Sequence, residues 1–330
     1  MIKVNMLFDD AYRDRWESLL ALNPILNDMG MALLDNSSDT ADINFIQNRI
    51  YSEMEKAADS RLGPPLIISE QADQEAVANH HRHLIRSPSV LAWVKECAFR
   101  NTSFHNHPIV HTYWHYNFMD HDLMKYPPSI PDQLTINEIE KIKLIWSVAS
   151  FKKFDDLRLL PSLDPKDRNI DVFFCGTMAY SDEILKNHRA LACQAVGRLS
   201  KWKTISAVSY VLETSDMNKF FRTSKIFVSA QGFSMSSYKD WQALYAGCVL
   251  IKPNSEQQKN YGPDLFEDKK WFVECRYDFS DLEEVVDKVM GNYDFYWQKS
   301  QEARLALCES VNLDQRARDF HKLISESVSL

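Results

Sequence analysis

Short apolar runs alternate with longer amphipathic segments along the first part of the chain. The apolar runs cover residues 2–8, 31–35, 42–47 and 65–69. Between the first two, the segment 12–30 places large apolar side chains at helical spacing and ends in a glycine, a common helix stop. A strand, helix, strand order with this rhythm predicts a parallel sheet whose strands are joined by crossover helices.

The same alternation returns after a charged segment with two prolines at 154–169. The chain after about residue 281 and the stretches between the apolar runs have helical spacing. We therefore predict an α/β protein of two domains with parallel sheets, divided into residues 1–162 and 163–330. The strands expected in the second domain are 170–176, 204–212, 225–230 and 248–253.

The segment between these two regular regions has a less distinct pattern. We interpret 91–99 as a helix and 108–118 as extended chain. Prolines punctuate a loop at 126–133, and 135–151 begins like a helix and ends like a strand.

Composition narrows the class of protein. Hydrophobic residues make up 45% of the 330 positions and charged residues 25%, as in a globular protein with a full core. The net charge of −8 argues against a nucleic-acid partner, because binding to phosphates requires a basic face.

The cysteines, the N-terminal segment and the lengths of the apolar runs bear on the cellular location of the protein. None of the six cysteines forms a CxxC pair, so we expect free thiols in a reducing environment. The N-terminal apolar run is short and followed by acidic residues, unlike a signal peptide, and no apolar stretch approaches the ~20 residues of a membrane span. We predict a soluble, cytoplasmic protein without an integral membrane segment. The basic cluster at 81–86 leaves contact with an anionic acceptor, or peripheral contact with a lipid headgroup of a membrane, open, although a solvated helix face is the favoured explanation.

The most informative segment for chemistry is 224–253. A buried strand ends at Ala230, and a loop with Gly232 and several serines opens the next helix. The N-terminus of a helix offers unpaired N–H groups and a partial positive charge, which favour a phosphate. Ser236, Ser237 and Lys239 would add hydroxyl donors and a cation. The alternative is a plain strand, loop and helix with a serine cap.

This segment resembles the donor-binding region of GT-B glycosyltransferases, and in particular the exostosin-like and group 1 families. The shared elements are a strand that begins Ser224–Lys225, a glycine loop, a helix with a basic residue and an alanine, and a following Ala246–Gly247–Cys248. The resemblance extends more weakly over 163–320. It implies two Rossmann-like domains whose parallel sheets face a central cleft, with a C-terminal helix that packs back across both domains.

The resemblance also implies the residues of a nucleotide-sugar site. Gly176 and Thr177 would face the diphosphate, and His188 and Arg189 would reach it from the next helix. From the 224–253 segment, the site would include the following residues: Gln231, Gly232, Ser236, Ser237, Tyr238, Lys239 and Gln242.

One departure from the family pattern affects the expected mechanism. The glutamate that holds the donor ribose in the family is Gln242 here, and the other acidic position of the retaining group falls on Ser234. A retaining mechanism therefore does not carry over, and inversion is favoured. The resemblance to the GT-B fold separately implies that no divalent metal is needed.

A transferase also requires a group that activates its acceptor. Asp9 and Asp10 follow the first predicted strand and Glu70 follows the fourth, where ligands of parallel sheets bind. Each is a candidate catalytic base. Alternatively, one of the aspartates caps the helix that follows.

Eight of the ten histidines lie between residues 80 and 121. Positions 107, 111 and 115 would share one face of a helix, but the surrounding residues favour a strand, on which the three would not converge. We therefore predict no metal site. His111, Tyr113 and Trp114 are interpreted as an acceptor site in which aromatic rings stack on a sugar.

The combined prediction is a glycosyltransferase that moves a sugar from a nucleotide-sugar to a hydroxyl of a glycan or glycoconjugate. The nucleotide-sugar is a substrate, and no cofactor is expected. Two alternatives stay open: a catalytically silent subunit that binds nucleotide or glycan, and a two-domain nucleotide-sugar epimerase.

Overall fold

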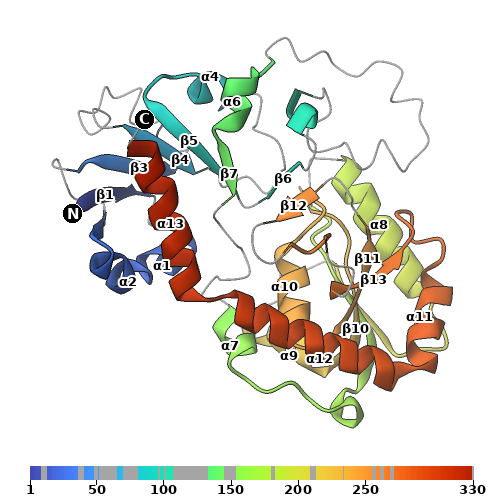
Figure 1. The fold of residues 1–330 in the computed structure, drawn as a ribbon. Coiled ribbons are helices and arrows are strands. Elements are labelled where there is room, and N and C mark those ends of the chain that lie inside the picture. The colour runs from blue at the N-terminus through green and yellow to red at the C-terminus, as the bar shows by residue number, and fades with distance from the viewer. Residues whose placement is uncertain are drawn as a thin grey trace.

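The structure is a computed structural model of the full 330-residue chain. It describes residues 1–8, 13–35, 41–47, 51, 65–69, 81–95, 97–99, 102–106, 133–144, 154–179, 183–208, 213–232, 234–254, 258–260, 264–267 and 271–328. Two parallel sheets with helices on their faces form the molecule, and a smaller two-stranded ribbon joins them (Figure 1).

The first sheet has six parallel strands in the order β2-β1-β3-β4-β5-β7. Its strands are β1 (Ile2–Leu7), β2 (Met31–Asp35), β3 (Ile43–Gln47), β4 (Leu66–Ser69), β5 (Val90–Lys95) and β7 (Ile142–Leu144). The strands predicted at 31–35, 42–47 and 65–69 are confirmed, and β3 and β4, inside the sheet, are fully buried.

The helix predicted over 91–99 is wrong. Val90–Lys95 is strand β5, and Cys97–Phe99 forms a separate short strand, β6. Val90, Ala92, Trp93 and Val94 are all buried, since β5 lies inside a parallel sheet and both of its faces are covered. A run that is apolar on both faces has no period from which a strand can be told from a buried helix.

The helices of the first half are short. They are α1 (Arg13–Leu20), α2 (Asn23–Asp28), α4 (Arg82–Ile85) and α6 (Ile136–Glu140), with a 3-10 helix at Thr102–Asn106. The stretch read as one helix is divided in two, because Pro24 begins α2 in its first turn, where proline is tolerated. Gly30 follows with a positive φ of 82°, as expected for a helix stop.

The second sheet has five parallel strands in the order β13-β11-β10-β8-β9. These are β8 (Ile170–Cys175), β9 (Thr204–Ala207), β10 (Ser224–Val228), β11 (Val249–Pro253) and β13 (Val273–Cys275). The helices of this half are α7 (Asp155–Arg158), α8 (Glu183–Gly197), α9 (Thr214–Thr223), α10 (Tyr238–Tyr245), α11 (Leu282–Gly291) and α12 (Tyr293–Ser310), with a 3-10 helix at Pro165–Asp167.

Side chains alternate between the two faces of this sheet. Phe173 and Cys175 point into one apolar cluster with residues of α9, α10 and α12, whereas Val172 and Phe174 point into another with residues of α8 and α11. Helices therefore cover both faces of the sheet, as the alternation of apolar runs and helical segments in the sequence predicts.

Two links join the halves. β6, directly after β5, pairs antiparallel with β12 (Gln258–Asn260), which follows β11. Because both strands of the ribbon leave the C-terminal ends of a sheet, those ends lie on the sides that the two sheets turn toward each other. The ribbon therefore sets the C-terminal edges of the sheets opposite one another.

The second link is the end of the chain. After α12 has packed on α10 and β11, α13 (Leu313–Val328) returns to the first half and contacts α2 (Figure 1). Phe320 meets Phe45 of β3 at 5.5 Å between ring centroids, and His321 Nε2 lies 3.1 Å from the Met29 carbonyl. The predicted return of the C-terminal helix across both domains is confirmed.

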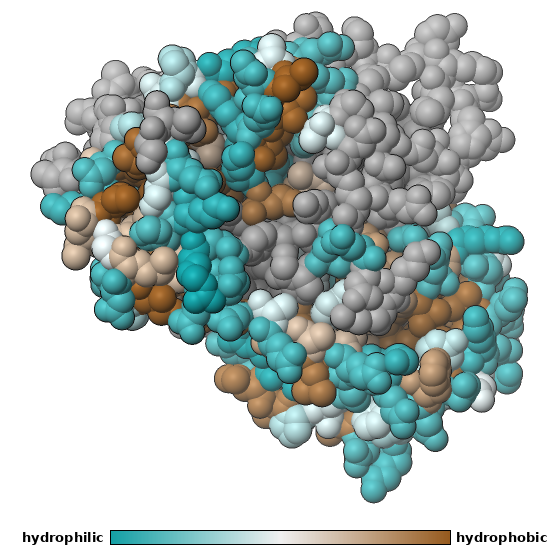
Figure 2. All heavy atoms as spheres, viewed as in Figure 1, coloured by the Kyte–Doolittle hydropathy of each residue, from teal (hydrophilic) through white to brown (hydrophobic). Residues whose placement is uncertain are grey.

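The outer surfaces of α12 and α13 are largely hydrophilic on the face seen in Figure 2. The inner side of α13 buries Ala317, Phe320, Leu323 and Ile324, which continue the apolar cluster of the first sheet into that of the second. The two helices thus act as a strap between the halves. Among the described residues, no helix combines the length and hydropathy needed to cross a membrane.

The end of α10 offers a test of the packing of α10 against α12. Gly247 has a φ of 71° and closes the helix: its N–H donates to the Leu244 carbonyl, and the Cys248 N–H donates to the Ala243 carbonyl. A Cβ here would collide with Ser162 Oγ and lie 2.7 Å from Gln301 Nε2.

We expect Gly247→Ala to lower the free energy of unfolding by about 1–3 kcal/mol, because it adds backbone strain and a clash. Gly197→Ala is the matched control, since nothing lies within 4 Å of its added Cβ and its φ is not positive. That change should leave stability unchanged or raise it by up to about 1 kcal/mol. Urea unfolding of both variants measures the difference, and equal stability would contradict the close packing of Gly247.

Candidate functional site

The crevice of the second sheet lies where its strand order reverses. From β8 the chain moves outward to β9 and then returns to form β10 on the other side of β8. The loops that follow β8 and β10 therefore leave the same edge in opposite directions. Such a switch point is the general ligand site of open parallel sheets.

Arg189 of α8 bridges these two loops. Its Nη1 donates to the Thr177 carbonyl at 2.9 Å, and its Nε donates to the Gln231 carbonyl at 3.3 Å. A Cβ placed on Gly176 would lie 3.5 Å from Arg189 Cδ, and one on Gly232 would lie 3.9 Å from Nη2. Both glycines therefore lie in van der Waals range of the Arg189 side chain.

His188, the preceding residue, is fully buried and fixes the start of the second loop. Its Nδ1 accepts a hydrogen bond from the Gln231 N–H at 3.2 Å, so the ring hydrogen is on Nε2, which donates to the Tyr277 carbonyl at 2.9 Å. The ring also stacks on Tyr277 at 4.1 Å between centroids. The imidazole therefore has a structural task in its neutral form.

The side chain of Gln231 is oriented by the same cluster. The Tyr277 hydroxyl donates to Gln231 Oε1 at 2.6 Å, which directs the amide nitrogen away from Tyr277. Gln231 is 1% exposed, and its Nε2 has no hydrogen-bond partner in the part of the chain that the structure describes. A buried donor without an acceptor is costly and indicates a missing partner.

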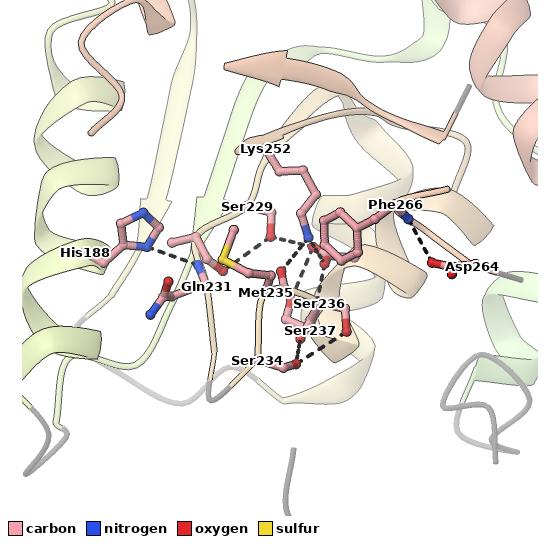
Figure 3. A network of polar contacts seen from close by, with 12 residues as sticks. His188, Ser229, Gln231, Ser234, Met235, Ser236, Ser237, Lys252, Asp264 and Phe266 are labelled. Carbon is pink, nitrogen blue, oxygen red and sulfur yellow. Dashed lines mark hydrogen bonds and ion pairs between the residues drawn. The ribbon is translucent and has the colours of Figure 1, made fainter. Parts of the chain in front are cut away.

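On the other side of the loop, a buried carboxylate organises the start of α10 (Figure 3). Asp240 accepts hydrogen bonds from the Ser237 N–H at 2.9 Å, from Ser237 Oγ at 3.3 Å and from Ser229 Oγ. Lys252 of β11 completes the set with an ion pair at 2.6 Å. Ser237 is thus the helix cap that the simpler interpretation of the sequence expected.

Two cations face the end of β8. The positive charges of Lys239, in the first turn of α10, and of Arg189 both lower the pKa of the Cys175 thiol, although burial outweighs them and raises it to about 12. Because Lys252 is paired with Asp240, the charge left at this edge by these four side chains is positive. No hydrogen bond or ion pair holds Lys239 among the described residues, so its ammonium group is available to a ligand.

The predicted site residues fall into three groups. Gly176, Thr177, His188, Arg189, Gln231 and Gly232 are brought into direct contact around the crevice. The second group lies along the loop and α10: Ser236 is buried, Ser237 caps the helix, and Tyr238, Lys239 and Gln242 are half-buried. The third group, outside the described residues, comprises Asp9, Asp10, Glu70, His111, Tyr113 and Trp114.

The sequence interpretation missed four residues of this network. Ser229, Asp240, Lys252 and Tyr277 come from four separate stretches of the chain, and only the fold joins them. A signal existed for one of them: a lysine inside the apolar run 248–253 has to be paired when that run is buried.

The first sheet also carries polar side chains at its C-terminal edge. Gln47, Ser69 and Lys95 are the last residues of β3, β4 and β5, and all three are buried. Deeper in the sheet, Asn5 Nδ2 donates to Asn44 Oδ1 at 3.1 Å between the paired strands β1 and β3. The C-terminal edge of the first sheet, which faces the second half, therefore carries polar side chains at the ends of β3, β4 and β5.

No group of histidine, cysteine and acidic side chains that could hold a metal occurs among the described residues. Positions 107, 111 and 115 of the histidine cluster lie outside them. The prediction that the protein lacks a metal site stays a prediction.

Comparison with known proteins places the fold. No family model matches the chain, and no curated protein sequence does. Solved structures do match: an α-glucosyltransferase in complex with UDP and a 13-mer DNA containing a HMU base has a TM-score of 0.53 at 8% identity, with 98% of this chain and 99% of that chain covered. Sucrose-phosphate synthase from Thermosynechococcus elongatus has a TM-score of 0.52 at 8% identity, with 99% of each chain covered.

These two structures match nearly the whole of both chains, so the likeness covers both halves and the strap together. At such low identity the likeness concerns the fold. The predicted architecture of two Rossmann-like domains is confirmed, and this chain has the GT-B fold of glycosyltransferases.

Proposed function

We propose that this protein is a glycosyltransferase that binds a nucleoside diphosphate sugar at the switch point of its second sheet. The observation that carries the proposal is the convergence of Arg189 and Lys239 on the end of β8, where the Gly176 and Gly232 loops meet. A diphosphate needs such paired cations and close backbone approach. Structures of the same fold contain UDP, which supports this ligand class.

The same groups would assist the chemistry. Departure of a nucleoside diphosphate develops negative charge on the leaving oxygen, and preorganised cations and helix N-terminal N–H groups stabilise it. Lys239 and the first turn of α10 would supply this stabilisation. The free Nε2 of Gln231 would donate to an oxygen of the diphosphate or the sugar.

The first half would bind the acceptor. Asp9 and Asp10 follow β1, which pairs with β2 on one side and β3 on the other, so they follow the switch point of the first sheet. Together with Glu70, they remain our candidates for the base that removes the acceptor proton, and His111, Tyr113 and Trp114 remain candidates for contact with the acceptor sugar. A hydroxyl of a glycan or glycoconjugate is the proposed acceptor. The negative net charge disfavours nucleic acid, although one structure with this fold was solved with DNA.

The finer proposal is an inverting reaction that needs no divalent metal. The inverting course rests on Gln242 and Ser234, which stand where the resembled retaining family carries acidic residues. The independence from a metal rests on the resemblance to the GT-B fold. We also propose that the protein is located in the cytoplasm. The two alternative activities give different products: an epimerase converts the donor without an acceptor, and a silent subunit binds the nucleotide without turnover.

Nucleotide binding is the first test. We expect one of UDP, GDP, TDP, CDP or CMP, at 100 times its dissociation constant, to stabilise the protein by about 2.7 kcal/mol. Lys239→Met should weaken binding roughly 10- to 100-fold, because a hydrogen bond to a charged group contributes about 1.5–3 kcal/mol. Thermal-shift titration and calorimetry measure both effects.

Lys219→Met is the control for this substitution. Lys219 is exposed on α9, which precedes β10 and lies toward the opposite edge of the sheet, so the change should leave nucleotide affinity as it is. If no nucleotide stabilises the wild-type protein, the assignment of the donor site fails.

The stereochemical course is tested separately once a donor and an acceptor are found. We expect the anomeric configuration of the product to be opposite to that of the donor, and the rate to be unchanged by EDTA. NMR of the anomeric proton during turnover decides the first point and an EDTA titration the second. A product with the donor's configuration would refute inversion without affecting the assignment as a glycosyltransferase.

A further inference from the structure

We propose that Lys252 is a positioning residue of the donor site, which holds the loop 234–237 and the start of α10 in their anion-binding arrangement and neutralises Asp240 beneath it. This inference rests on the proposed function. Lys252 is on β11 and would not touch the nucleotide. Its task is to shape the loop that does.

The geometry of Lys252 supports a positioning task. Its side chain is 1% exposed, and its Nζ donates to the Met235 carbonyl and to Asp240 Oδ2, both at 2.6 Å. The ring of Phe266 lies 4.9 Å from the same nitrogen. The ammonium group is thus enclosed by protein acceptors and an aromatic ring, and the side chain points from β11 toward the Met235–Ser237 loop (Figure 3).

Asp240 connects Lys252 to two other parts of the site through hydrogen bonds. It accepts from Ser229 at the end of β10, from Ser237 at the helix cap and from Lys252. Ser234 Oγ donates to the Ser236 carbonyl at 2.6 Å, so the loop between these anchors is also bonded internally. Removing Lys252 would remove the hydrogen bond to the Met235 carbonyl and the cation that pairs with Asp240.

The charge of the Asp240–Lys252 pair is a second argument for the positioning role of Lys252. Asp240 is in the first turn of α10, where a bound diphosphate would add negative charge. An unpaired carboxylate there would oppose the anion, whereas the pair with Lys252 is neutral and leaves Arg189 and Lys239 in excess. Burial lowers the pKa of Lys252, and the nearby carboxylate of Asp240 counteracts that shift.

Stability alone does not account for such a pair. Replacing both members of a buried ion pair with uncharged residues of similar size is often neutral or stabilising, whereas removing one member is strongly destabilising. Comparing the single and the double variant therefore separates a structural role from a positioning role. A double variant can recover the stability of the fold without recovering the conformation of the loop.

The experiment compares wild type, Lys252→Met and the double variant Lys252→Met/Asp240→Asn. We expect the single variant to lose roughly 5–15 °C in thermal midpoint, because it leaves a buried charge unpaired. The double variant should regain most of that loss. Affinities for UDP and for uridine are then measured by calorimetry and ligand-observed NMR.

A positioning role predicts a split between the two probes. The double variant should bind UDP at least about tenfold more weakly than wild type and uridine within about twofold, since only UDP uses the phosphate loop. Lys225→Met is the matched control: it breaks the 2.7 Å ion pair with Asp171 at the far ends of β10 and β8, and should leave both affinities unchanged.

The outcomes are distinct. If the refolded double variant binds UDP as tightly as wild type, Lys252 is a structural residue only and the positioning role is overturned. If both probes weaken equally, the loss is general and the role is likewise overturned. If wild type binds neither UDP nor another nucleotide, the proposed function itself fails, which is a different result from either.

Discussion

The parallel pairing of β8 with β10 is the constraint on which the site depends. Parallel neighbours end at the same edge, so the loops after them emerge side by side although the strand ends, Cys175 and Val228, are 53 positions apart in the chain. Their inward-turned carbonyls need donors, and Arg189 supplies one to each loop. The contacts of His188, Tyr277 and Asp240 then fix the loop after β10 relative to that bridge.

Much of the fold was predictable from the sequence. Strands such as 66–69 and 249–253 are short apolar runs bounded by polar residues, and such runs are buried in a parallel sheet wherever helices intervene. The return of α13 was expected from a resemblance rather than from spacing. The two faces of β5 could not be separated by period, which is why 91–99 was assigned to a helix.

The site was only partly predictable, for a physical reason. Residues next to a strand end, such as Gly176 and Gly232, are placed by topology alone. Lys252 and Tyr277 act through contacts across separate strands, and their partners are fixed by packing that no local pattern encodes. Gln231 was predicted as a ligand contact, yet its orientation depends on a tyrosine 46 residues later.

The strap formed by α12 and α13 has a mechanical consequence. Because α13 packs on the first sheet while α12 packs on the second, each lobe is built from chain segments that are not contiguous. Opening or closing of one lobe against the other would be concentrated at the two residues between the helices, Val311 and Asn312. The β6–β12 ribbon is another connection between the lobes and would have to bend in the same motion.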